Sequence, residues 1–376
     1  MADTADLRVD PKELRDVARR VLEAAGTVPA VRACAGAADA WVPVWDDIVA
    51  AGWTGIAIPE DFGGAGASFA DLAVVLVELG RALAPGPYLG SAVLATSGLL
   101  CGGTAAQREY WLPRLASGEY IATAALTGSS GRLGAAETRP TLRPDAGGWR
   151  LDGVADHVPD LPAAETVIVA ADLQGEPALV LVRPADHDEL VVEPTPMFDL
   201  SRRFGRLRAD GAYLGPGALM ARGGDAVTAI DAMIAWGAGA LACDSLGLAE
   251  RVLDSTVAYA GQRVQFNRPI GTFQAVKHRC ADMFLAVASS RVAVEEAARQ
   301  ISADVGRAGA AASLAKAHAG DAAAQVAGDG VQLHGGIGFT WEHDSHLYLK
   351  RAKLNQALLG SSRWHRRRLA DSWLPR

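Results

Sequence analysis

The chain is poor in cysteine, with 4 among 376 residues, and the four form no CxxC pair. They stand far apart, at Cys34, Cys101, Cys243 and Cys280. This spacing argues against a disulfide framework and against a zinc site, because both need cysteines that the fold can bring together. We therefore expect a reducing environment. Because the acidic first residues also contain no apolar leader, we expect a cytoplasmic protein.

Long hydrophobic runs and an excess of positive charge are also absent. The longest apolar run, Ala232 to Cys243, is shorter than the ~20 residues that a membrane-spanning helix needs, so no membrane insertion is expected. A net charge of −7 argues against nucleic acid or an anionic membrane as the main partner. The basic run Arg366 to Arg368 is a local exception. We interpret it as a solvated surface, with a phosphate-rich ligand as the alternative.

The chain divides into three stretches that differ in residue pattern. Helical periodicity dominates the first stretch, short β-rich runs separated by Pro, Gly and Asp fill the second, and helical periodicity returns in the third. We predict a mostly α fold with a central β-domain. The predicted domains are an N-terminal α-helical domain over residues 1–118, a middle β-domain over 119–223 and a C-terminal four-helix bundle over 224–376. A cleft between the last two would suit a flat cofactor.

The stretch "YAGQRVQFNRPIGTFQAVKHR", Tyr259 to Arg279, ends one predicted helix, turns and begins the next. Arg263 and Arg268 stand on either side of the turn. The start of the new helix offers free N–H groups and a partial positive charge, and a nearby guanidinium fits phosphate oxygens. This combination suits a pyrophosphate, although an arginine-rich turn between helices can also be purely structural.

The stretch "VQLHGGIGFTWEHDSHLYLKRAK", Val331 to Lys353, follows a long predicted helix. Its glycines, at positions 335, 336 and 338, permit close approach of another backbone or of a ligand. Its three histidines match no spacing that is typical of metal ligands, so no metal is predicted.

Together these two stretches closely resemble the acyl-CoA dehydrogenase family, as does "GIAIPEDFGGAGASFADLAVVLVELGRALAPGPY" nearer the N-terminus. The resemblance covers nearly the whole chain and is weakest in the middle. It implies the three domains in the predicted order and a dimer of dimers, with FAD held between the β-domain and the bundles of adjacent subunits. It also implies an acyl-CoA substrate, dehydrogenated between Cα and Cβ to a 2,3-enoyl-CoA, and an electron-transfer acceptor.

The family's cofactor contacts carry over to matching positions of this chain. The adenosine-side matches are Arg263, Phe266, Gln274, Gln332, Gly335 and Gly336. The resemblance implies that Arg263, Phe266 and Gln274 contact the diphosphate and adenosine of FAD. It implies that Gln332, Gly335 and Gly336 contact the FAD of a neighbouring subunit. Ser361 stands where a hydroxyl usually meets the diphosphate, and Thr127 stands where one usually meets the flavin.

The family's carboxylate base is missing from both of its usual places. Many members have a Glu directly before a Gly-Thr or Gly-Ser pair, whereas here Leu359 precedes Gly360 and Ser361. Other members carry the Glu in the first long helix of the bundle, where the match is Gly237. Asp244 follows Gly237 by two helical turns on the same face and lies in an apolar run. We expect it to be buried, either as a base with a raised pKa or as the partner of an arginine.

The middle domain departs from the family as well. The stretch "ALTGSSGRLGA" keeps Thr127 but lacks the usual Glu-Pro, and "ADHVPDLPAA" replaces the run that usually covers the flavin ring. Such losses are similar to those in acyl-CoA dehydrogenases built from two different homologous chains, common in actinobacterial steroid side-chain degradation. There one chain supplies the base and most flavin contacts, and the partner completes the adenosine side.

Three hypotheses follow. The first is an FAD-dependent acyl-CoA dehydrogenase subunit in a tetramer whose homologous partner chain supplies the base. The second is a self-sufficient homotetrameric enzyme that uses Asp244 or an unrecognised acid. The third is a non-catalytic scaffold subunit.

Overall fold

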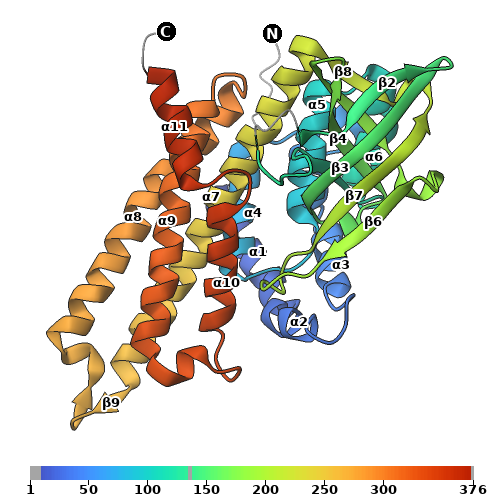
Figure 1. Cartoon of the computed structure of the whole chain (residues 1–376). Helices are drawn as coiled ribbons and strands as arrows, with labels where there is room; N and C mark the ends of the chain where they lie inside the picture. Colours follow the sequence, from blue (N-terminus) through green and yellow to red (C-terminus); the bar gives the residue numbers. More distant parts are fainter. Residues whose placement is uncertain (1–9, 134–137, 374–376) are drawn as a thin grey trace.

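The computed structural model describes residues 10–133 and 138–373. A layer of helices and a twisted β-sheet form one half of the molecule, and a set of long helices forms the other (Figure 1). The prediction of a mostly α fold with a central β-domain is therefore confirmed.

The N-terminal layer consists of short helices. They are α1 (Pro11–Ala24), α2 (Thr27–Ala33), α3 (Val42–Ala50), α4 (Phe69–Arg81), a π-helical segment (Leu89–Ala95), α5 (Thr96–Gly102) and α6 (Ala105–Ala116). Helix α4 begins with a capping box. The Ser68 hydroxyl accepts from the Asp71 N–H at 3.4 Å, and the Asp71 carboxylate accepts from the Ser68 N–H at 2.9 Å. This reciprocal pair fixes where the helix begins.

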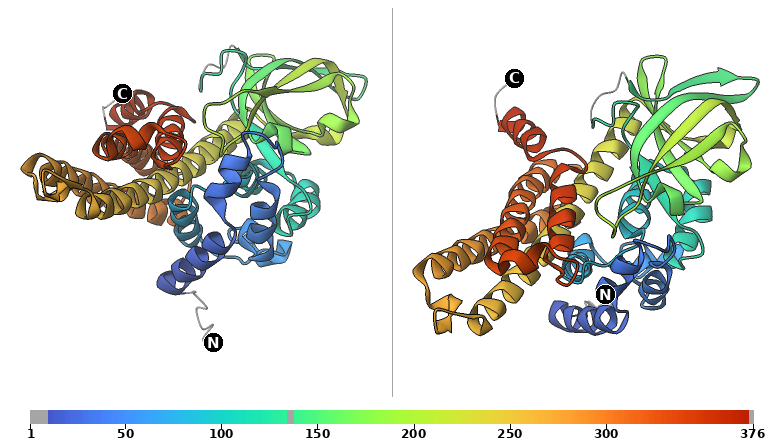
Figure 2. Two further views of the ribbon diagram at one scale, coloured as in Figure 1. Left: turned by 90° about the horizontal axis from the view of Figure 1, so that it is seen from below. Right: turned by 60° about the horizontal axis from the view of Figure 1, so that its bottom comes forward.

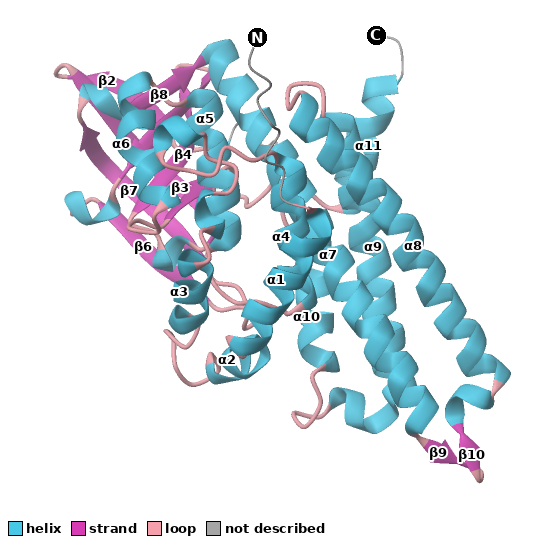
Figure 3. Ribbon diagram, turned by 180° about the vertical axis from the view of Figure 1, so that it is seen from behind, coloured by secondary structure: helices cyan, strands magenta, loops and turns pink. Residues whose placement is uncertain are grey.

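The middle of the chain forms one sheet (Figure 3). Its strands are β1 (Ala122–Ala125), β2 (Thr141–Asp145), β3 (Gly148–Pro159), β4 (Thr166–Leu173), β5 (Glu176–Val182), β6 (Leu190–Thr195), β7 (Phe204–Leu214) and β8 (Leu219–Arg222). Their order is β6-β7-β3-β2-β4-β5-β8, with β1 parallel to β4. Strand β4 is buried on both faces, since Ile168 packs in the helical core and Val167 in the core of the sheet. This explains its unbroken apolar sequence.

Long helices form the C-terminal part (Figure 2). They are α7 (Gly223–Gln262), α8 (Gln274–Ala303), α9 (Gly309–His334), α10 (Ser345–Ala357) and α11 (Ser362–Trp373), with a hairpin of β9 (Val264–Gln265) and β10 (Arg268–Pro269) between α7 and α8. Helix α7 is long and apolar enough to cross a membrane, but 83% of its most apolar window is buried inside the protein. It is the core helix on which the other parts of the molecule pack.

The last helical stretch is not continuous. The periodicity predicts one segment over residues 343–371, whereas the structure ends α10 at Ala357 and starts α11 at Ser362. The chain turns between them because Leu359 has a φ of 52° and Gly360 a φ of 100°, both outside the helical range. This turn places Leu359 and Gly360 at the candidate site.

Candidate functional site

The two positions at which a base was expected face each other across a closed contact. A Cβ atom added to Gly237 of α7 would lie 2.3 Å from Leu359 Cδ1 and 2.9 Å from Leu94 Cδ2. The Leu359 side chain is buried. The place that a carboxylate from either position would occupy is therefore filled by aliphatic carbon, and Gly237 is the residue that leaves room for it.

Side chains that the sequence reasoning did not single out hold the Leu359–Gly360 turn. His365 Nε2 lies 3.0 Å from the Leu359 carbonyl, and its Nδ1 lies 3.1 Å from the Ser313 hydroxyl. Burial lowers the pKa of His365 to about 3, so this imidazole is neutral and donates one proton to the carbonyl. Lys316 Nζ, itself fully buried, donates to the Gly360 carbonyl at 3.3 Å. The turn is thus fixed from two sides. The sequence feature that could have identified Lys316 is that it is the one lysine in the alanine-rich stretch of α9.

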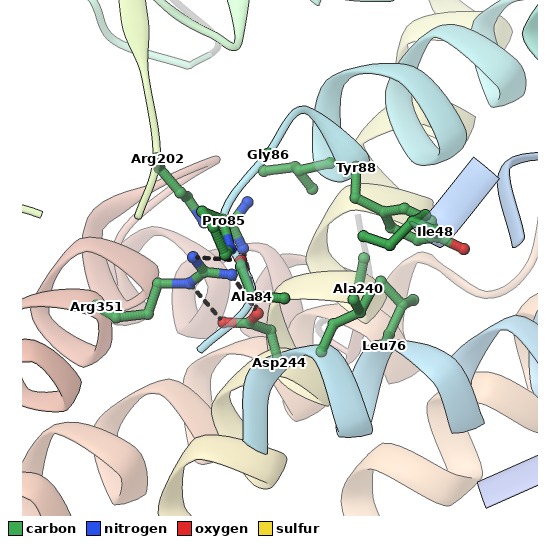
Figure 4. A pocket seen from close by; sticks show the side chains of 12 residues that line it. Ile48, Leu76, Ala84, Pro85, Gly86, Tyr88, Arg202, Ala240, Asp244 and Arg351 are labelled. Atoms are coloured by element: carbon green, nitrogen blue, oxygen red, sulfur yellow. Dashed lines mark hydrogen bonds and ion pairs between the residues drawn. The ribbon is translucent and has the colours of Figure 1, made fainter. Parts of the chain in front are cut away.

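Asp244 is buried, as expected, with 3% of its surface exposed. Arg351 holds its carboxylate in a fork, with Nη2 2.7 Å from Oδ1 and Nε 3.1 Å from Oδ2. Arg202 Nη2 lies 3.4 Å from Oδ1 (Figure 4). Burial by itself would raise the pKa of Asp244, but the positive charges of Arg351 and Arg202 outweigh it and hold that pKa at about 2.

The expectation that Asp244 has a raised pKa is therefore wrong, because two buried guanidiniums stabilise its charged form. The other expected role, as the partner of an arginine, is the one that the geometry shows. A carboxylate with a pKa near 2 is a weak proton acceptor at neutral pH, and this one already accepts hydrogen bonds at both oxygens. We therefore do not assign the base to Asp244.

A second buried acid, Asp160, escaped the sequence reasoning. It is 2% exposed, it follows β3 with a left-handed φ of 57°, and its Oδ2 accepts from the Gly90 N–H at 2.9 Å. Burial raises the pKa of Asp160 to about 6. It lines neither of the two cavities described below, so it does not meet a ligand there.

The smaller cavity lies beside the Asp244 cluster and encloses about 20 Å³. Figure 4 shows Arg351, Arg202 and Asp244 on one side of it and the apolar side chains of Leu76 and Ala240 on the other. This volume is enough for about one water molecule. It offers no room for an acyl chain.

The larger cavity is an open depression of about 620 Å³ where the middle domain, α7 and α11 meet. Its lining residues are Arg132, Leu133, Arg139, Pro177, Val227, Ile230, Asp231, Ile234, Trp364, Arg367, Arg368 and Asp371. Burial lowers the pKa of Arg139. The basic run of α11 is thus divided, since two of its three arginines line the cavity and Arg366 pairs with Asp321.

This larger cavity reaches the turn after α10. A Cβ atom on Gly360 would lie 2.7 Å from the Trp364 ring, which lines the cavity. Ser361 is exposed, and its hydroxyl accepts from the Trp364 N–H at 3.3 Å at the start of α11. The Thr127 hydroxyl donates to the Asp156 carbonyl and so is already engaged within the middle domain.

The predicted adenosine-side residues gather at the opposite end of the bundle. Phe266 is 88% exposed and forms, with Asn267, the two-residue turn between β9 and β10, both at positive φ. Arg263 and Gln274 are exposed beside it. At the end of α9, Gln332, Gly335 and Gly336 are exposed too, and a Cβ atom added to either glycine would meet nothing within 4 Å. The backbone there is open to an approaching ligand.

The tip of the bundle lies far along α7 from the contact between Leu359 and Gly237. Helix α7 runs from the end of β8 to the β9–β10 hairpin at the tip (Figures 1 and 3), and Gly237 lies in its first half. The 25 residues from Gly237 to Gln262 span roughly 37 Å at about 1.5 Å per residue. The predicted adenosine-side residues at the tip are therefore well separated from the contact between Leu359 and Gly237.

Two family models match the chain. "Acyl-CoA dehydrogenase, N-terminal domain" matches residues 9–119, and "Acyl-CoA dehydrogenase, C-terminal domain" matches residues 226–374. The chain is 38% identical to acyl-CoA dehydrogenase IpdE2 of Mycolicibacterium smegmatis over 319 residues, which cover 85% of this chain and 83% of that protein.

Two solved structures have the same fold. A variant of the Tcur3481-Tcur3483 steroid ACAD superposes with a TM-score of 0.85 at 32% identity, over 96% of each chain. The ChsE4-ChsE5 complex from Mycobacterium tuberculosis superposes with a TM-score of 0.87 at 28% identity, over 99% of this chain and 100% of that one.

Proposed function

The chain belongs to the acyl-CoA dehydrogenase family, and we propose that it is one subunit of an FAD-dependent enzyme whose partner chain supplies the catalytic base. The reaction is the α,β-dehydrogenation of an acyl-CoA to a 2,3-enoyl-CoA. The acyl group comes from lipid or steroid breakdown, in keeping with the neighbour described as a steroid ACAD. The assembly is a tetramer that passes its electrons to a separate acceptor.

The observation that carries the proposal is the aliphatic contact between Leu359 and Gly237. Removal of a proton from Cα of a thioester needs a positioned base, which contributes roughly 10²–10⁴-fold. Both family positions for that base meet at this contact and neither is acidic. Asp244, the buried acid seven residues further along α7, is held as a charged partner of Arg351. A second chain that carries a carboxylate resolves this deficit.

The residues at the bundle tip fit the adenosine half of FAD. Arg263 provides a guanidinium fork for the diphosphate, and Gln274 and Gln332 provide amides that can pair with the adenosine. Gly335 and Gly336 leave space for close approach. FAD, when bound, accepts the hydride from Cβ of the substrate. This chain's part is to bind and orient the adenosine end of a cofactor whose flavin ring lies in the partner.

The proposal uses the three predicted domains in turn. Within the described residues, the predicted domains 1–118 and 224–376 give the helical frame, and the predicted domain 119–223 gives the β-domain that closes one side of the larger cavity. ChsE4-ChsE5 is described as a complex of two chains, which is the kind of assembly that we propose here.

Flavin content tests the proposal. We expect the chain purified alone to carry little FAD, and the chain purified with its native partner to carry FAD and to oxidise an acyl-CoA. A homogeneous chain with one FAD per polypeptide and acyl-CoA oxidation of its own would refute the need for a partner. Absence of flavin from every complex with native partners would instead support the scaffold hypothesis.

A further inference from the structure

The loop between α9 and α10, residues 335–344, is held at both of its ends by imidazole rings. This segment, the glycine loop, contains the two glycines that the proposed function gives to the adenosine of FAD. His334 precedes it and stacks on Tyr259 of α7, with ring centres 4.5 Å apart. His343 stands near its other end, and its ring centre lies 4.4 Å from that of His334. The two ends of the loop therefore meet through a pair of imidazoles.

His343 also caps α10 with a ring nitrogen. Its Nδ1 atom accepts from the Ser345 N–H at 3.1 Å and lies 2.7 Å from the Ser345 hydroxyl. Because a backbone N–H can only donate, Nδ1 carries no proton and the imidazole is neutral. This bond satisfies one of the first N–H groups of α10, which have no partner within the helix. The neighbouring Asp344 carboxylate is bound by Arg32 of α2 at 2.6 Å instead.

The groups around His343 disfavour a second proton on its ring. Burial lowers the pKa of His343, and His334 and Arg32 lower it further, while the charge of Asp344 opposes them. A proton on Nδ1 would break the bond from the Ser345 N–H. It would also put a positive charge at the positive end of the α10 dipole. Protonation therefore removes the cap and repels the helix that the cap begins.

Two more ring nitrogens are buried in the same cluster. Within the part of the chain that the structure describes, neither His334 Nε2 nor His346 Nε2 has a hydrogen-bond partner. His334 Nδ1 donates to the Gly330 carbonyl at 2.7 Å, so its Nε2 is an unused acceptor. Burial lowers the pKa of His346, and Lys350 adds to this effect. The cluster thus accommodates protons poorly while the loop is closed, and water would solvate them once it opens.

We propose that His343 is a positioning residue, whose neutral imidazole keeps the glycine loop closed and whose protonation releases it. The closed loop lowers the pKa of His343 below 6.5, its ordinary value, which applies when the loop is open. The closed loop therefore binds fewer protons than the open one, so closure is favoured above about pH 6.5 and weakens as the pH falls below it. The adenosine end of FAD is then held at neutral pH and released by acid. This last link rests on the proposed function, whereas the response of the loop rests on the contacts of His343.

Hydrogen–deuterium exchange of the full chain, without partner or cofactor, tests the loop. The protection of amides in residues 340–348, relative to the intrinsic exchange rate at each pH, is compared at about pH 7.5 and about pH 5.5. In the unmodified chain we expect this protection to fall about fivefold or more at the lower pH, which is the effect of losing one helix cap. Amides in the middle of α9 should keep their protection, which excludes global unfolding.

Two substitutions at position 343 separate the proton from the bond. In His343→Asn the amide oxygen can accept from the N–H two residues on, as asparagine does in turns, but it does not titrate, so protection should agree within about twofold at the two pH values. His343→Leu can neither accept nor titrate and should show low protection at both. His187→Asn, the same change in the middle domain, is the control and should behave like the unmodified chain.

FAD affinity of the assembled complex is measured at the same two pH values. We expect the unmodified complex to bind FAD about fivefold or more weakly at the lower pH, and His343→Asn to lose most of this dependence. A residue that only stabilised the fold would not give a pH profile that asparagine abolishes.

Three results would overturn the proposal. They are protection that does not change with pH in the unmodified chain, the same change in His343→Asn, and an FAD affinity whose pH dependence is equal in the two complexes. A complex that bound no FAD at any pH would refute the proposed function and with it the link to the cofactor. The exchange measured on the chain alone would still decide whether His343 controls the loop.

Discussion

Leu359 and Gly237 lie 122 residues apart in the sequence and share one space, since the Leu359 Cδ1 atom sits 2.3 Å from where a Cβ atom on Gly237 would be. Either position could carry the base of a family member. In this chain the Leu359 side chain fits only because residue 237 is a glycine and has no side chain. Both positions that could carry the base are thus occupied by one apolar packing contact.

Gly237→Ala tests this complementarity. The added methyl meets Leu359 and Leu94, and we expect overpacking to lower the free energy of unfolding by about 1–3 kcal/mol. Leu359→Ala in the same chain should recover part of that loss, giving a coupling of about 0.5–3 kcal/mol in a double-mutant cycle measured by chemical denaturation. Gly261→Ala is the control, because this glycine is in the same helix with nothing within 4 Å. Additive effects of the first two changes would contradict the shared space.

Asp244→Asn tests whether this acid is structural. The change removes the carboxylate that pairs with both buried arginines, Arg351 and Arg202, and we expect a loss of about 3–5 kcal/mol in the free energy of unfolding. Replacing the pair together, as Asp244→Asn with Arg351→Met, should cost less than Asp244→Asn alone. If Asp244→Asn left stability unchanged while abolishing turnover of the assembled enzyme, a catalytic role would have to be restored.

Asp160 predicts a distinct pH dependence. Burial raises its pKa in the folded state from 3.8 to about 6. The folded protein therefore holds a proton that the unfolded chain releases, and stability falls as the pH rises from about 4 to about 6. We expect Asp160→Asn to be more stable than the unmodified chain by roughly 1–3 kcal/mol at pH 7, with little difference at pH 4. Denaturation at several pH values measures this, and an equal difference at pH 4 and pH 7 would be inconsistent with the raised pKa.

Arg263→Ala tests the contact at the bundle tip. In the assembled complex we expect at least a tenfold loss of FAD affinity, because a guanidinium that binds a diphosphate is removed. Arg299→Ala serves as the control, since Arg299 is exposed on α8 and pairs with Glu296 of the same helix. Equal FAD affinity in the Arg263 variant and the control would remove this residue from the cofactor site.

The sequence alone is sufficient to predict those helices and strands that follow from local residue patterns. The apolar spacing and Ser68 gave α4 and its start, and the continuous apolar run of β4 reflected burial on both faces. Strand β7 is harder to recognise from the sequence, because its exposed positions carry arginine and aspartate in a glycine-containing run. The chain leaves the helical conformation after α10 through a leucine as well as a glycine, since both Leu359 and Gly360 have positive φ.

The site shows a different limit. The sequence located Gly237, Leu359 and Asp244 but not their relation, because contacts across more than 100 residues depend on how α7 meets the turn after α10. The sign of the Asp244 pKa shift depended on Arg351, which comes from another helix. Burial could be read from the apolar run around Asp244, whereas its counter-charge could not.

The most direct test of the central claim, that this chain has no base of its own, is exchange of the Cα protons of an acyl-CoA in deuterium oxide. The full chain, supplied with FAD, is incubated with the thioester, and deuterium uptake is followed by mass spectrometry beside a buffer blank. The account predicts uptake no faster than in buffer for this chain alone and faster uptake once the partner chain is added. Uptake well above buffer with this chain alone would contradict it.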